Sequence, residues 1–176
     1  MAADDDTWVY DDPGIPAEAY VHRRLTEQSH LVFDDEEGRY VISIAAYRYA
    51  DADGMSVYVS SEMDKQGIAD ADLLAYCSFG LARVQVVTIR GGQSLAGADA
   101  GASMSTASGV SGGVILREAK DFPADDERVR KSHGLVRIHV RPSGKPYWNA
   151  FRNRLIQGSE YRASLTAPWL AAGAAS

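Results

Sequence analysis

The fold class follows from two stretches of the chain, LARVQVVTI at residues 81–89 and LVRIHVR at residues 135–141. Both are rich in β-branched residues, and the second alternates apolar with polar side chains, the pattern of a strand that buries one face. Val136 and Ile138 are expected to face the core, while the basic side chains between them face outward. Each stretch is therefore predicted to form a β-strand.

Further elements are predicted on both sides of these two strands. Shorter strands are expected at residues 20–25, 30–33, 39–47, 55–60 and 114–117, and helices at residues 69–77, 123–132 and 147–157. Hairpins dominate the first half, and helices and strands interleave irregularly. This predicts a single α+β domain with a mostly antiparallel sheet of about six or seven strands and about three short helices. The predicted core is Val84, Val86, Val136, Ile138, Trp148, Phe151 and Leu155.

The 176 residues are expected to form one domain between two tails. Residues 1–16 are acidic and rich in proline and glycine, which predicts a flexible arm, and residues 163–176 form an uncharged tail. The domain itself spans residues 17–162 and contains an unusual loop at residues 91–113. That loop holds 7 glycines and a single charge, so it is expected to be either disordered or a mobile cover over a site.

Composition excludes several classes of protein. Apolar residues make up 45% and charged residues 24% of the chain, and no apolar run is long enough to span a membrane. The one cysteine, Cys77, allows no internal disulfide and no cysteine-rich zinc site, and we expect a buried, inert thiol in a reducing cytoplasm. The four histidines lack the spacing of metal ligands, so no metal site is predicted.

Charge is distributed unevenly along the chain. Residues 1–75 carry 17 acids and 5 bases, a net charge of -12, whereas residues 76–176 carry 7 acids and 13 bases, a net charge of +6. A basic C-terminal face predicts either internal pairing with the acidic half or an anionic partner. The candidate binding residues on this face are Arg137, His139, Arg141, Lys145, Tyr147 and Arg152. The first function predicted is thus a small intracellular binding module, without a cofactor, for a protein or an anionic partner, either a nucleic acid or a phosphate.

A second set of residues suggests an enzyme. Arg23 lies on the first predicted strand, Tyr58 on a later one, and Glu118 ends the strand after the long loop. With the stretch from Gly54 to Glu62, this set resembles ADP-ribosyltransferase-like folds. That resemblance implies NAD as cofactor, with Arg23, Tyr58 and Glu118 as the catalytic candidates. The three side chains should then converge in one cleft.

A third pattern resembles a family of small bacterial proteins. It consists of Arg23-Arg24-Leu25, then Ser43 and Tyr47, then Met55-Ser56-Val57. The family has no assigned activity, so the resemblance implies a bacterial origin and one compact domain, and it transfers no chemistry. The small bacterial intracellular binding module and the ADP-ribosyltransferase-like enzyme therefore both remain open at this point.

Overall fold

A six-stranded antiparallel sheet forms the centre of the computed structural model, which describes residues 8–48, 54–91, 111–119, 126–139 and 145–163. The strand order is β6-β7-β4-β1-β5-β8, and every neighbouring pair is antiparallel. Its strands are β1 Tyr20–Leu25, β4 Met55–Val59, β5 Gly80–Gln85, β6 Gly112–Leu116, β7 His133–Ile138 and β8 Ser159–Arg162. A separate hairpin pairs β2 Leu31–Asp34 with β3 Arg39–Ile42. The predicted α+β fold with a mostly antiparallel sheet is confirmed.

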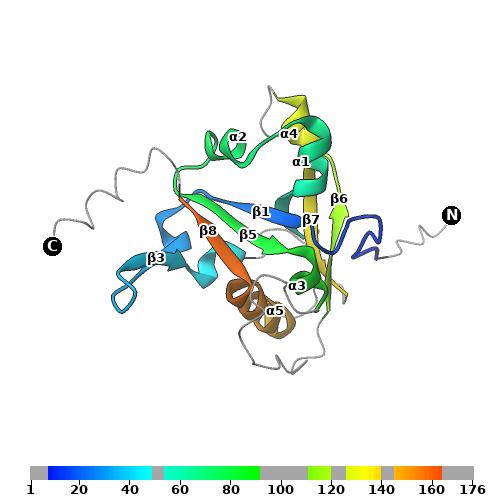
Figure 1. Ribbon diagram of the computed structural model, residues 1–176. Helices are drawn as coiled ribbons and strands as arrows, with labels where there is room; N and C mark the ends of the chain where they lie inside the picture. The colour runs from blue at the N-terminus through cyan, green and yellow to red at the C-terminus, as the bar shows by residue number, and fades with distance from the viewer. Residues whose placement is uncertain (1–7, 49–53, 92–110, 120–125, 140–144, 164–176) are drawn as a thin grey trace, which may run out of the picture.

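Helices cover both faces of this sheet (Figure 1). The α-helices of the described residues are α1 Ser60–Gln66, α2 Asp70–Leu74, α3 Val86–Arg90, α4 Glu127–Lys131 and α5 Lys145–Gln157, and two 3-10 turns are η1 Gln28–His30 and η2 Ile44–Tyr47. Helices α1, α2 and α4 gather on one face, here called the upper face, and α3 and α5 lie on the other, the lower face. The β2–β3 hairpin flanks the lower face. Five helices are therefore present in the described residues, where about three were expected.

The two faces bury separate apolar clusters. The larger cluster lies on the lower face and contains all seven predicted core residues, including Phe151 and Leu155 of α5, which are fully buried. The smaller cluster lies on the upper face and includes Tyr58, Met63, Leu73, Leu81 and Val129. The predicted core is thus confirmed, but it belongs to only one of the two buried clusters.

Two adjacent glycines in β6 make room for a neighbour on each face. A Cβ atom on Gly112 would lie 2.3 Å from the ring of Phe151, and one on Gly113 would lie 2.3 Å from Cβ of Asp11. Since successive residues of a strand point to opposite faces, α5 packs on one side of β6 and the N-terminal segment on the other. Both positions therefore require glycine.

The N-terminal segment also closes the outer edge of β6. The amide of Asp12 donates to the Val114 carbonyl at 2.8 Å, and the Val114 amide donates to Oδ1 of Asp11 at 3.0 Å. Asp11 accepts further hydrogen bonds from Arg90, and Ile15 is buried in the larger cluster. Residues 8–16 of the predicted flexible arm are thus packed against the domain. The remaining residues of that arm lie outside the described residues, as do residues 92–110 of the predicted loop and 164–176 of the predicted tail.

Several predicted strands end earlier than the sequence suggested, and three of them lead directly into a helix or a 3-10 turn. The strand expected at 81–89 stops at Gln85, because the amides of Val86 and Val87 donate to Ala19 and Ala17, which turns the chain into α3. The run expected at 39–47 stops at Ile42, because the Ser43 hydroxyl accepts from the Ala45 amide and caps η2. The run at 55–60 ends at Val59, where α1 begins. Tertiary contacts and caps override strand propensity in these places.

No helix among the described residues is both long enough and apolar enough to cross a bilayer.

Candidate functional site

The described residues of the predicted basic C-terminal face lie on both sides of the sheet. Val136 and Ile138 of β7 pack with Phe151 on the lower face, so Arg137 points to the opposite side of the sheet from α5. The Arg137 guanidinium lies over the Trp8 ring, 4.4 Å from its centroid, and donates to the Val9 carbonyl at 2.6 Å. The N-terminal segment therefore contacts Arg137 through the Trp8 ring and the Val9 carbonyl.

The other described residues predicted for that face lie near Ser111 or on α5. The imidazole of His139 lies within hydrogen-bonding distance of the Ser111 backbone and edge-on to Tyr10. Tyr147 is exposed on α5, and Arg152 is partly buried on the same helix with its Nε atom enclosed. Arg141 and the side chain of Lys145 lie outside the described residues. Among the described residues, Arg137 and His139 thus lie on the opposite side of the sheet from Tyr147 and Arg152 of α5.

The three catalytic candidates of the ADP-ribosyltransferase-like hypothesis also lie apart. His22 of β1 pairs with Tyr58 of β4, so these two side chains share the upper face and Arg23 points to the lower face. Tyr58 is buried in the smaller apolar cluster. Glu118 is exposed beyond the end of β6, and its negative charge acts on Lys131 of α4. Arg23 and Tyr58 thus face opposite sides of the sheet, so these two side chains do not converge as that hypothesis expected.

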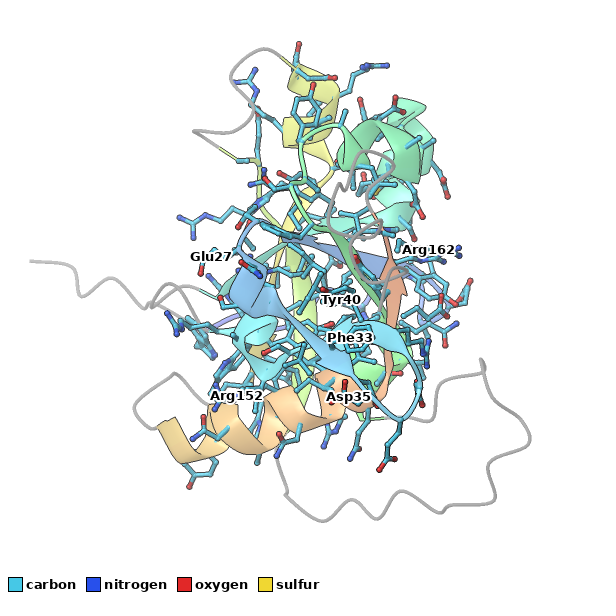
Figure 2. The ribbon with its side chains drawn as sticks, turned by 90° about the vertical axis from the view of Figure 1, so that its left-hand side faces the viewer. Glu27, Phe33, Asp35, Tyr40, Arg152 and Arg162 are labelled. Atoms are coloured by element: carbon cyan, nitrogen blue, oxygen red, sulfur yellow. The ribbon has the colours of Figure 1, made fainter. Side chains whose placement is uncertain are left out.

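A small polar pocket lies at the end of β1, beside η1 and η2. Its volume is about 120 Å³, and it is lined by Arg23, Thr26, Glu27, Ser29, His30, Ala45 and Arg48. Figure 2 looks onto this side of the molecule, where Glu27 lies beside the β2–β3 hairpin that carries Phe33 and Tyr40. Of the candidate site residues that the structure describes, Arg23 alone lines this pocket.

Arg23 is held in place where two strands separate. The β1–β4 ladder has its last pair at His22 and Tyr58, and the next residue on β1 is Arg23. Its Nη1 donates to the Ser56 carbonyl at 2.9 Å, and its Nε donates to the Ala46 carbonyl at 3.2 Å. The guanidinium thus bridges β4 and η2 and fixes a positive charge at the wall of the pocket.

Histidine and hydroxyl groups complete the lining. Nδ1 of His30 accepts the Thr26 amide at 3.2 Å, so the ring hydrogen is on Nε2 in the neutral form. Burial lowers the pKa of His30, and the charge of Arg23 lowers it further, which favours that neutral form. The Ser29 hydroxyl donates to the Glu27 carboxylate at 3.2 Å. Two arginines against one glutamate leave the pocket with a net positive charge.

Little in the sequence pointed to this pocket. Thr26, Ser29, His30 and Arg48 come from a turn, a 3-10 segment and the residue after η2, and no motif spacing connects them. The available signal was polar and basic residues gathered just after a short strand. That signal is common in loops.

Comparison with known proteins found no family model that matches the chain, no similar curated protein and no similar solved structure. Within the described residues, no three His, Cys, Asp or Glu side chains are grouped as a metal ion would need.

Proposed function

We propose that this protein is a binding module whose pocket at the end of β1 recognises a small anionic group, such as a phosphate or a carboxylate, on its ligand. The observation that carries the proposal is the presence of two arginines, two hydroxyl residues and a neutral histidine around one small pocket. Arginine and hydroxyl donors are the groups that bind such anions. This keeps the anionic partner expected from the sequence and moves its site away from the basic C-terminal face.

Pocket size limits what is bound. Sites that enclose a whole small molecule usually measure about 300–1,000 Å³. At about 120 Å³ this pocket takes only a head group, so the rest of the ligand must lie on the surrounding surface. Exposed apolar side chains are available there, because Ile44 of η2 and Val32 of β2 are 40% and 55% exposed.

The direct test is a titration with inorganic phosphate and with acetate, followed by backbone amide shifts in NMR spectra. Shifts should appear first at Thr26 and Ser29, and added salt should weaken binding. The substitution Arg48→Gln should weaken phosphate binding by about 10- to 100-fold, the usual cost of a lost charge-assisted hydrogen bond. Arg48 is exposed, so this change is expected to leave the fold intact.

The matched control is Arg39→Gln, which removes an exposed arginine that pairs with Glu37 at the hairpin tip, outside the pocket. It should bind phosphate as the unchanged protein does. Equal affinity for Arg48→Gln and the unchanged protein, or shifts spread over all exposed arginines, would reject the pocket as the anion site.

A further inference from the structure

A serine and a histidine on neighbouring central strands form a short hydrogen-bonded pair. Ser56 lies on β4 and His133 on β7, and the register places them one diagonal step apart on the upper face of the sheet. Oγ of Ser56 is 2.7 Å from Nε2 of His133. On the other side of the ring, Nδ1 is 2.6 Å from the carbonyl oxygen of Arg117.

This geometry fixes the hydrogen on the imidazole. A carbonyl oxygen only accepts, so Nδ1 carries the hydrogen and donates it to Arg117. Nε2 then has its lone pair directed at Ser56 and accepts the hydroxyl hydrogen. The order of hydroxyl, imidazole and orienting acceptor is that of a nucleophile, its base and the group that holds the base.

The surroundings favour the neutral form of His133 and leave Ser56 partly exposed to solvent. Burial lowers the pKa of His133, and the Arg24, Arg117 and Arg23 charges add to that effect, while the bond to the Arg117 carbonyl opposes it. The Tyr58 ring packs edge-on against the imidazole, with centroids 5.7 Å apart. Ser56 is only half-buried. A neutral base hydrogen-bonded to the hydroxyl of a partly exposed serine is the arrangement that proton abstraction requires.

The position in the sheet adds a positive charge. The β1–β4 ladder ends at His22 and Tyr58, and Ser56 is the next residue of β4 on the same face. Arg24 of β1 also lies on this face, with its guanidinium carbon 5.8 Å from the Tyr58 ring centroid. Its charge also acts on His133, the partner of Ser56. A cation on this face is suited to a transition state in which an oxygen becomes negative.

We propose that Ser56 is a catalytic nucleophile, His133 its general base and Arg24 the group that stabilises the oxyanion, for hydrolysis of an ester. This site lies on the upper face, whereas the anion pocket lies beside the lower face, so each proposal can fail without the other.

The reaction proceeds in two steps, transfer of the acyl group to Ser56 and hydrolysis of the acyl-serine. The Ser56 oxygen attacks the ester carbonyl carbon as its proton passes to Nε2 of His133, and the tetrahedral oxyanion faces Arg24. The C–O bond to the alcohol then breaks, and the proton on Nε2 moves to the departing oxygen. Water attacks the resulting acyl-serine with His133 again as base, which releases the acid and restores the serine hydroxyl.

The experiment is labelling of the full chain with a fluorophosphonate probe, with the adduct located by mass spectrometry. One adduct per chain is expected on Ser56, and 4-nitrophenyl acetate should be hydrolysed at a rate that falls as His133 is protonated below neutral pH. Ser56→Ala should abolish the adduct, and His133→Gln should slow labelling by at least about 100-fold. Arg24→Gln should slow it less, with partial recovery in Arg24→Lys.

Controls separate chemistry from folding. Ser78→Ala alters an exposed serine of the same domain and should label like the unchanged protein. Ser56→Cys keeps a nucleophile beside His133, and its new thiol should be alkylated by iodoacetamide faster than Cys77, whose pKa burial raises to about 11. Labelling on other serines, no adduct in the folded unchanged protein, or an unreactive new thiol in Ser56→Cys would overturn the proposal and leave the pair as a structural hydrogen bond.

Discussion

The two faces of the central sheet differ in what they bury. Within the described residues the lower face holds 21 buried apolar side chains in one cluster, whereas the cluster of the upper face holds 7. Beside those 7, the upper face buries His22 and His133, both with lowered pKa values. The difference teaches that the lower face supplies most of the apolar burial, while a larger share of the groups buried on the upper face are titratable, and their burial costs stability and tunes their chemistry.

The largest loss of stability is expected from a substitution on the lower face. Phe151 of α5 is fully buried against Gly112, and Phe151→Ala should lower the free energy of unfolding by about 3–5 kcal/mol. Urea denaturation measures this change. A loss below about 1 kcal/mol would mean that the lower face is not the main source of stability.

The upper face should make stability depend on pH. Burial lowers the pKa of His22 to about 4 from its ordinary 6.5, with Asp70 opposing this effect. Between those two values the unfolded chain binds the proton that the folded protein excludes, so the free energy of unfolding should fall as the pH falls, by up to about 3 kcal/mol in total.

Urea denaturation at several pH values measures that slope, and His22→Gln should flatten it. The matched change on the lower face is Ile89→Val, which should cost about 0.5–1.5 kcal/mol at every pH. If both variants keep the original slope, the pH dependence of stability does not come from His22.

An intermediate effect is expected at the outer edge of β6. Asp11→Asn removes the charge that pairs with Arg90 at 2.9 Å, both side chains being about one-quarter exposed. The free energy of unfolding should fall by about 1–2 kcal/mol, as for a hydrogen bond to a charged group, and urea denaturation measures the change. Glu37→Gln breaks an exposed ion pair of the hairpin and should change it by less than about 0.5 kcal/mol. A comparable loss in both variants would contradict a special role for Asp11.

The smallest effect is expected on the outer side of the β2–β3 hairpin. Val32 is 55% exposed, so Val32→Ser should change the free energy of unfolding by less than about 0.5 kcal/mol. Thermal unfolding over a range of protein concentrations provides the measurement. A loss of stability in Val32→Ser that grows with protein concentration would show that a second copy of the protein covers this side of the hairpin.

The core of the lower face could be predicted from the sequence, whereas on the upper face the sequence predicted the burial of Cys77 but not of the cluster around it. Alternation in residues 135–141 and the helical stripe of Trp148, Phe151 and Leu155 predicted the lower core correctly. Helix α1 was missed because its sequence, SSEMDKQ, has one buried apolar residue, Met63, and its end depends on Gly67 at positive φ. Strand β8 was missed because SEYR carries no apolar pattern.

The candidate sites were predictable only in single residues. Arg23 was singled out, but its role depends on the point where β1 and β4 separate, which only strand pairing reveals. Ser56 and His133 are 77 positions apart and meet through the β4–β7 register. Charge counting could not place Arg137 beside Trp8, because it ignores which side of a strand a residue occupies.

Asp11 and Asp12 cover the outer edge of β6 and so prevent that strand from pairing with a strand of another molecule. An open strand edge invites a second molecule to add a strand of its own. Here the Val114 amide and carbonyl are already satisfied from within the chain, by one side chain and one amide. A protein that lacks its first twelve residues would have an open edge at β6, and its solubility would then fall as its concentration rises.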